Sequence, residues 1–230
     1  MIFDKKTEEA IFIQRPNRFQ AWVRLNDEKI MVHVPNTGRL KEILIPGCRC
    51  LVRHENGPNR KTRHSLIGAW KGEILINFDS QVPNKVVEEA LLKKQIPFLA
   101  RADLVEREKT FGRSRFDFKL IRDGYTDYYL EVKGVTLELD GIVSFPDAVT
   151  ERGAKHLREL VLAREAGHGA GLIFVAQLAD ARHFTPNTVM DPDFTLALTE
   201  AHAAGVDIMA YTCDITTESL TLAREIPVIL

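Results

Sequence analysis

The sequence predicts an α/β (α+β) protein in two parts, a small β-barrel over residues 1–80 and a larger α/β domain with a mixed sheet over residues 81–230. Three observations favour this division. Short β-prone runs separated by turn residues fill the first part, helical periodicity begins only at Pro83-Asn84, and strand-like runs then alternate with helices. A chain of 230 residues is long enough for two small domains.

The first part consists of runs of β-branched and aromatic residues between turn residues. The predicted strands are 10–14, 19–25, 29–34, 49–54, 65–70 and 73–77, and one short helix is expected within 37–45. Five or six strands at this spacing are typical of a small barrel.

The second part opens with the helix at Pro83-Asn84. Strands follow at 98–107, 115–121 and 128–135, then a helix from about 150 to 166, a buried-type strand at 171–177, a helix at 194–204 and a strand at 207–212. Strands that first meander and are then separated by helices indicate a mixed sheet.

Charge is unevenly distributed along the chain. Residues 1–80 carry 14 Lys and Arg against 9 Asp and Glu, a net +5, whereas residues 81–230 carry 17 against 23, a net −6. A basic first part suits a polyanionic partner, although ordinary fluctuation of surface charge explains the asymmetry equally well. No apolar run approaches the length of a membrane span and no signal-peptide pattern follows the start, so we expect a cytoplasmic protein.

The stretch 114–134 places Asp117 on one predicted strand and Glu131 and Lys133 on the next. A two-residue turn at 123–124 would send the two acids to opposite faces of the sheet. A three-residue loop with Gly124 in the left-handed conformation would instead set Asp117 diagonal to Glu131, about 7 to 8 Å away, a span that a cation can bridge.

Two carboxylates and a lysine in this arrangement would form an all-oxygen site for Mg²⁺ or Mn²⁺. The ion would polarise a phosphodiester and activate water, while Lys133 orients that water or offsets charge on the phosphate. Glu88 or Glu89 of the preceding helix could add a ligand or base, and the sequence does not separate the two. The Glu131-Val132-Lys133 triplet by itself is more typical of a surface hairpin with salt bridges. The apolar residues that flank the two acids would bury them, and burial favours a metal site.

The helix expected from residue 150 carries cations beside this hairpin. Arg152, Lys155 and His156 recur at three- and four-residue spacing and would face phosphates next to the metal. A solvated helix face, balanced by Glu151 and Glu159, is an equally good interpretation.

Several long motifs occur in one order along the chain: RPNRF at 15–19, HVPNTGRL at 33–40, SRFDF at 114–118, YLEVKGVTL at 129–137 and FPDAVTERGAKHLREL at 145–160. Together they resemble the sugar fermentation stimulation protein A family over essentially the whole chain. The resemblance implies an OB-like barrel followed by a PD-(D/E)XK nuclease-like domain.

The resemblance also implies roles for residues of the second part. Asp117, Glu131, Lys133 and Glu88 or Glu89 fall on the nuclease positions of a metal-dependent DNA endonuclease or phosphodiesterase, with Asp117 and Glu131 as metal ligands. Phe116 stands where the nuclease pattern has its proline, a departure that bears on cutting more than on the fold.

The function implied by the resemblance is DNA binding without strong sequence preference, linked to regulation of sugar (maltose) metabolism. A DNA-binding protein of the cytoplasm could associate with the nucleoid. Cations of the first part suit this function, namely Arg15, Arg18, Arg24, Arg39, Arg60, Lys61, Arg63 and His64. Phe19 and Trp22 lie among them and could stack on bases, although each is more typical of barrel core. A purely regulatory DNA-binding protein with an inactive nuclease fold and a sugar-binding effector remain as alternatives.

Overall fold

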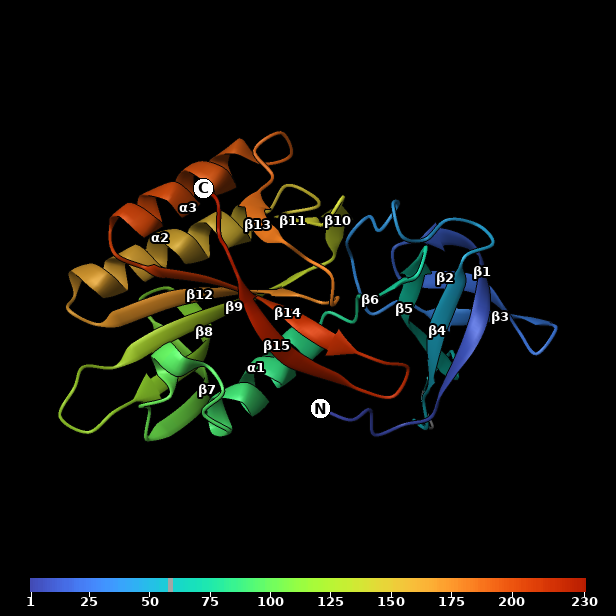
Figure 1. Ribbon diagram of the computed structural model, residues 1–230, viewed down its shortest axis with the longest axis horizontal. Coiled ribbons are helices and arrows are strands. Elements are labelled where there is room, and N and C mark those ends of the chain that lie inside the picture. Colours follow the sequence, from blue (N-terminus) through green and yellow to red (C-terminus); the bar gives the residue numbers. More distant parts are fainter. Residues whose placement is uncertain (58–59) are drawn as a thin grey trace.

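The computed structural model describes residues 1–57 and 60–230, which form two packed units (Figure 1). Of the basic stretch 57–64, Pro58 and Asn59 therefore lie outside the described residues. The first unit contains β1 (Thr7–Asn17), β2 (Gln20–Leu25), β3 (Glu28–His33), β4 (Arg49–His54), β5 (His64–Lys71) and β6 (Ile74–Asn77). These strands follow the order β3-β2-β1-β4-β5-β6, and a bridge between His33 and Ser65 joins β3 to β5 and closes a five-stranded barrel. The predicted barrel is thereby confirmed.

Alternation of side chains builds the barrel core. In β2, Ala21, Val23 and Leu25 are buried, while Trp22 is half-buried and Arg24 is exposed. The turn to β3 contains Asn26 and Asp27, whose φ values of 49° and 65° suit a tight hairpin turn.

The short helix expected within 37–45 is not present; this stretch contains only turns. Leu40 has a left-handed backbone with φ of 50°, and bonds to its carbonyl from Ile43 N at 3.3 Å and Leu44 N at 2.9 Å form one isolated turn. A helix requires consecutive right-handed residues and Pro46 follows closely, so the turn does not extend.

The second unit is an α/β domain whose mixed sheet confirms the predicted fold class. Its elements are α1 (Val82–Leu92), the 3₁₀ turn η1 (Pro97–Leu99), β7 (Leu104–Phe111), β8 (Ser114–Ile121), β9 (Tyr128–Val135), β10 (Leu137–Leu139), β11 (Ile142–Phe145), α2 (Glu151–Glu165), β12 (Gly169–Ala176), β13 (His183–Pro186), α3 (Pro192–Ala203), β14 (Asp207–Ile215) and β15 (Leu220–Ile226). The six-stranded sheet has the order β15-β14-β12-β9-β8-β7, in which β9, β12 and β14 are parallel to one another and the other neighbours are antiparallel.

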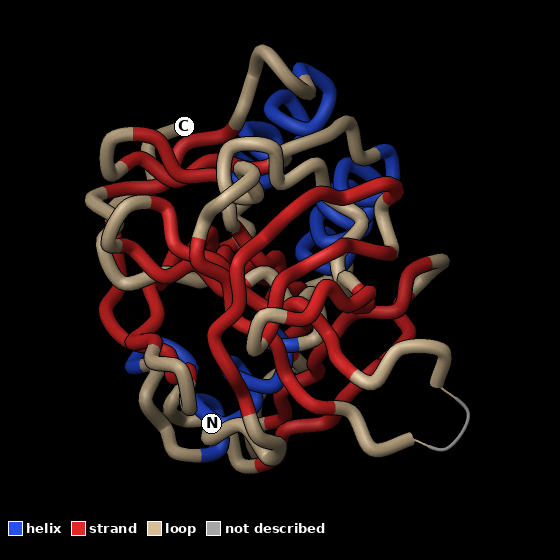
Figure 2. The backbone as a smooth tube through the Cα atoms, turned by 90° about the vertical axis from the view of Figure 1, so that its right-hand side faces the viewer, coloured by secondary structure: helices blue, strands red, loops and turns tan. Residues whose placement is uncertain are grey.

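Helices cover both faces of this sheet. α1 packs on one face and α2 with α3 on the other (Figure 1), and from the barrel end the helices appear as two groups on opposite sides of the strands (Figure 2). The strand expected at 98–107 begins only at Leu104, because η1 occupies its first residues. The sequence did not predict β10, β11, β13 or β15, of which the first three form a separate small sheet.

Direct contacts join the two units. Asn77 N donates to Gln177 O at 3.0 Å, and Lys71 Nζ at the end of β5 donates to the buried Glu138 carboxylate on β10 at 2.7 Å. The start of the chain leaves the barrel and lies along the second unit, where Phe3 N donates to Glu218 O at 2.8 Å. No helix in the described part of the chain is both long and apolar enough to cross a membrane.

Candidate metal site and nucleic-acid surfaces

The register of β8 and β9 brings the two predicted acids together. Phe118 pairs with Leu130, so the next position along the two strands places Asp117 beside Glu131. The connection between the strands spans 122–127 and is longer than the three-residue loop of the sequence prediction; Asp117 is held by Asn84 of α1, whereas Glu131 contacts His156 of α2. Gly124 has a φ of 74°, the left-handed conformation expected of it.

Asp117 lies where β8 separates from β9. Its Oδ1 accepts a hydrogen bond from Asn84 Nδ2 of α1 at 2.6 Å, and its Oδ2 accepts one from Val132 N at 2.8 Å. On the other side, the residue opposite Asp117 in the register is Glu108 of β7, whose left-handed φ of 53° interrupts the regular strand. Burial and the neighbouring charge of Glu131 raise the pKa of Asp117 to about 6.

Glu131 is the more deeply buried acid, with 3% of its surface exposed. Its Oε1 accepts a hydrogen bond from Lys133 Nζ and lies 2.5 Å from His156 Nδ1. Burial raises the pKa of Glu131, but the hydrogen bond with His156 and the charge of Lys133 together hold it below the ordinary value. Its Oε2 is buried and has no hydrogen-bond partner among the described residues.

The carboxylate oxygens of Asp117 and Glu131 fit a hard divalent cation. The unpartnered Oε2 of Glu131 and the neighbouring Asp117 carboxylate would supply two anionic oxygens. No group of three or more His, Cys, Asp or Glu in the described ranges is arranged to hold a metal. An ion here would therefore complete its shell with water or backbone oxygens, as Mg²⁺ usually does.

The acids predicted on α1 do not contact this pair. Glu88 forms an ion pair with Arg107 at 3.1 Å, and Glu89 binds Lys93 and the chain's amino group. Asn84, one helical turn before Glu88, is the α1 side chain that reaches Asp117. The sequence prediction did not include Asn84, because only the acidic residues of this helix were considered as ligands.

A basic groove of about 470 Å³ includes His156, the residue that contacts Glu131. All three predicted cations of α2 line it, together with two arginines, one serine and one acid, namely Arg152, Lys155, His156, Arg113, Arg115, Ser114 and Glu151. Arg152 Nε lies 3.4 Å from His156 Nε2, and Lys155 Nζ donates to Arg113 O at 3.2 Å. His156 thus contacts both the acid pair and the groove.

A cleft of about 200 Å³ lies between the two units, at Gly134 of β9. Gly38 from the HVPNTGRL motif, Asp147 from the FPD motif, Gly134 and Gln177 line it. Arg39 N donates to Asp147 Oδ2 at 3.0 Å, so the two motifs meet across the junction. Gln177 is 1% exposed, and its Oε1 has no partner in the described chain.

The predicted barrel cations occupy different environments. The two terminal nitrogens of Arg15 donate to four backbone carbonyls at 2.7–3.1 Å, those of Arg18, Asn36, Gly38 and Arg39. Burial lowers the pKa of Arg15. Arg15 therefore holds the HVPNTGRL segment in place, whereas Arg18, Arg24, Arg39 and Arg63 are exposed.

A second groove, of about 500 Å³, crosses the barrel surface and includes Phe19, His33, Arg60 and Lys61. Phe19 is 52% exposed, so the interpretation of this ring as barrel core is wrong. The guanidinium of Arg18 lies 5.7 Å from its centre. Trp22 is half-buried outside this groove, with Lys29 Nζ 5.0 Å from its ring centre.

Comparison with known proteins covers the whole chain. The model of the SfsA N-terminal OB domain matches residues 13–78, and that of the sugar fermentation stimulation protein RE domain matches residues 81–219. Sugar fermentation stimulation protein homologs of Clostridium tetani and Clostridium acetobutylicum are 56% and 53% identical over 230 residues, covering 100% of each chain. The structure of Pyrococcus furiosus SfsA in complex with Ca²⁺ matches with a TM-score of 0.91 and 28% identity, over 100% of this chain and 98% of that one.

Proposed function

Because the chain belongs to the sugar fermentation stimulation protein family, we propose that it binds DNA without strong sequence preference and carries a Mg²⁺- or Mn²⁺-dependent nuclease-type site in its second unit. It would act on DNA in the cytoplasm, in the regulation of sugar (maltose) metabolism. The observation that carries this proposal is the grouping of Asp117, Glu131 and Lys133 next to His156, which lines a basic groove.

Asp117 and Glu131 would hold the metal ion. The ion supplies a Lewis acid that polarises a phosphodiester and lowers the pKa of bound water. A Ca²⁺ complex of the Pyrococcus furiosus relative supports a site of oxygen ligands, since Ca²⁺ and Mg²⁺ share this preference.

The protein's own cations would position the nucleic acid. Lys133 Nζ lies at Glu131 and would offset the charge that builds on a phosphate during cleavage. Arg152 and Lys155 would bind neighbouring phosphates, while His156 keeps Glu131 oriented through its 2.5 Å contact. Such contacts recognise the backbone and not the bases, in keeping with weak sequence preference.

The barrel groove would bind a second part of the nucleic acid. Exposed Phe19 offers a face for base stacking, and Arg60 and Lys61 offer charge for phosphates. An aromatic ring between cations is the usual arrangement in surfaces that bind single strands.

The direct test is cleavage of labelled single-stranded, duplex and branched DNA by the purified protein with Mg²⁺ or Mn²⁺, beside EDTA. We expect metal-dependent products that disappear in Glu131→Gln and Lys133→Met, while Glu88→Gln cuts normally because Glu88 is paired with Arg107. Shifted bands without products under every condition would contradict the nuclease and leave DNA binding.

A purely regulatory DNA-binding protein is the second candidate. The observation in its favour is that Lys133 and His156 already contact Oε1 of Glu131, so the acid is paired within the protein. This candidate requires DNA affinity that is insensitive to chelator and to Asp117→Asn. A sugar-binding effector has only the family name in its favour, and calorimetry with maltose would detect it.

A further inference from the structure

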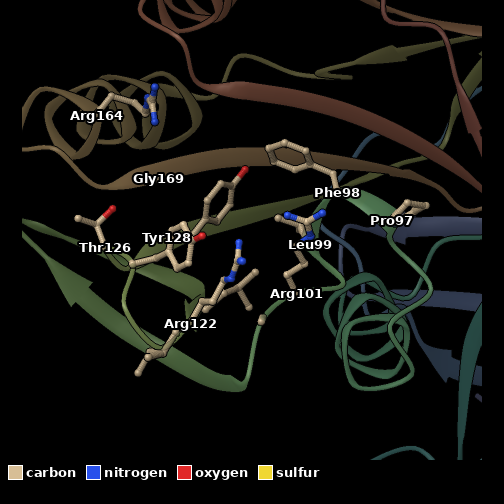
Figure 3. A pocket seen from close by; sticks show the side chains of 13 residues that line it. Pro97, Phe98, Leu99, Arg101, Arg122, Thr126, Tyr128, Arg164 and Gly169 are labelled. Atoms are coloured by element: carbon tan, nitrogen blue, oxygen red, sulfur yellow. The ribbon is translucent and has the colours of Figure 1, made fainter.

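A hollow of about 530 Å³ lies at the end of the sheet where β9 and β12 begin (Figure 3). It is lined by residues of η1, the β8–β9 connection and the end of α2, among them Phe98, Arg101, Arg122, Tyr125, Tyr128 and Arg164. Tyr128 begins β9, whereas Lys133 stands near the other end of that strand, and α1-side neighbours surround Tyr128. The hollow is therefore separate from the acidic site.

Positive charge dominates this hollow. Three arginines line it, Arg101, Arg122 and Arg164, and no acidic residue does so among the described residues. Within the same part of the chain none of the three forms an ion pair, and Arg164 Nη1 donates only to the His168 carbonyl, at 3.3 Å. Figure 3 shows Arg101 and Arg122 reaching toward the space beside Phe98 and Tyr128, with Arg164 extending from α2. Three unneutralised guanidinium groups around one hollow favour an anionic ligand.

Flat rings accompany these charges. Phe98 and Tyr125 are 61% and 63% exposed, unusual values for large apolar rings. The guanidinium of Arg122 lies 3.7 Å from the centre of the Tyr125 ring, which presents a stacked cationic surface. Phe98 meets Tyr128 edge to face, with ring centres 6.2 Å apart.

Two glycines of β12 leave room for the Tyr128 ring. A Cβ at Gly169 or Gly171 would lie 2.2 Å or 2.1 Å from atoms of the Tyr128 side chain, so only glycine lets this ring lie on β12. The Tyr128 hydroxyl donates to Asp207 Oδ2 at 2.9 Å, which holds the ring in place. The ring is thus fixed before any ligand arrives.

We propose that this hollow binds a planar anion of nucleotide size, a nucleoside monophosphate being the simplest example. The arginines would bind the phosphate, and the exposed rings would stack on the base. Planar stacking surfaces next to three arginines fit a base joined to a phosphate better than they fit a neutral sugar. This second site is independent of DNA cleavage.

The test is calorimetric titration of the full chain with AMP, alongside adenosine, ribose 5-phosphate, inorganic phosphate and maltose. We expect AMP to bind most tightly, and its dissociation constant to rise at least about tenfold in Arg101→Gln and in Arg122→Gln, the loss of one charged hydrogen bond. Arg101 is exposed and Arg122 is half-buried, and circular dichroism would verify that the variants fold.

Two controls separate this site from the rest of the molecule. Arg158→Gln removes an exposed arginine of α2 that is paired with Asp193, and Glu131→Gln alters the acidic site; both should bind AMP as the unaltered protein does. Absence of AMP binding at millimolar concentration, equal affinity in the Arg101 and Arg122 variants, or equally tight binding of adenosine, ribose 5-phosphate or maltose would each overturn the proposal.

Discussion

At the scale of single residues, surroundings give chemically similar side chains different roles. Asp117 and Glu131 are neighbours, yet burial and its neighbour's charge raise the pKa of Asp117, while His156 and Lys133 hold that of Glu131 down. Arg15 and Arg18 are three positions apart, yet the first is bound to backbone carbonyls and the second is exposed. Residue type alone therefore does not identify a ligand-binding side chain.

The acid pair predicts a metal-dependent change in stability. Mg²⁺ or Ca²⁺ at about ten times its dissociation constant should stabilise the protein by about 1.4 kcal/mol and raise its melting temperature by about 3 to 5 °C. Asp117→Asn and Glu131→Gln should abolish the shift, measured by differential scanning calorimetry. Glu88→Gln is the matched control, and an undiminished shift in the Asp117 variant would place the ion elsewhere.

The contrast between Arg15 and Arg18 predicts different effects of the same substitution. Arg15→Gln leaves the part-buried carbonyls of Asn36 and Gly38 without their donor and should lower the free energy of unfolding by about 1 to 2 kcal/mol. Arg18→Gln should change it by less than about 0.5 kcal/mol and weaken DNA binding instead. Urea unfolding measures the first effect and DNA titration the second. Comparable losses of stability in both variants would show that the bonds of Arg15 to backbone carbonyls do not stabilise the fold.

At the scale of elements, α2 joins the acidic site to the surface. Thr150 caps the helix through a 3.0 Å bond from Gly153 N, which places position 156 against Glu131 while positions 152 and 155 line the groove. Arg152, Lys155 and His156 lie at the predicted spacing on α2, but they differ in burial, since His156 is buried and the other two are exposed. His156 faces inward and the other two face the groove.

The exposed pair on α2 predicts a change in salt dependence. The double variant Arg152→Gln/Lys155→Gln should bind DNA more weakly and reduce the slope of log affinity against log salt by about 2, since each lost phosphate contact accounts for about 0.9. Fluorescence anisotropy over a range of salt concentrations measures the slope. Arg158→Gln, on the same helix but paired with Asp193, should leave it unchanged; an equal loss in this control would mean that general charge, not the groove, binds DNA.

At the scale of the whole molecule, buried ion pairs connect the start of the chain, the barrel and the junction. Glu55 binds Lys5 at 2.6 Å and Arg53 at 2.9 Å, and Arg53 also binds Asp79 at 2.8 Å. Asp79 precedes α1, so these contacts help to set the orientation of the two units and thus the cleft at Gly134.

This network predicts a pH dependence of stability. Burial raises the pKa of Glu55, but the hydrogen bonds from Lys5 and Arg53 outweigh it and lower the pKa from 4.5 to about 2. Because the folded value is below the unfolded one, the stabilisation is present above about pH 4.5 and is lost as pH falls toward 2. Glu55→Gln should therefore be less stable than the unaltered protein at neutral pH, and the difference should shrink at about pH 3.

Urea unfolding at several pH values measures this difference. Glu9→Gln is the control, because Glu9 forms an exposed pair with Arg49 and exposed pairs contribute little. A deficit of the Glu55 variant that stays constant from neutral to acidic pH would show that its charge is not what stabilises the junction.

Local periodicity was enough to predict much of the fold. The alternation in β2 and the helical patterns at α1 and α2 follow from which side chains are buried, because burial selects apolar residues at regular spacing. The short strands β10, β11 and β13 show no such pattern, since three or four residues are too few to show a period. β15 was missed for a different reason, because its mostly half-exposed residues resemble a loop.

The sequence by itself determined the barrel and the mixed sheet, because strand alternation is local, and its motifs gave Asp117, Glu131 and Lys133 as the predicted site residues. Only the tertiary structure decided the register that joins the acids, the contact of Asn84 in place of Glu88, and the buried role of Arg15. The hollow at the start of β9 was likewise invisible, since its arginines come from three distant segments. Such contacts depend on how distant segments pack together, and no local pattern in the sequence predicts that packing.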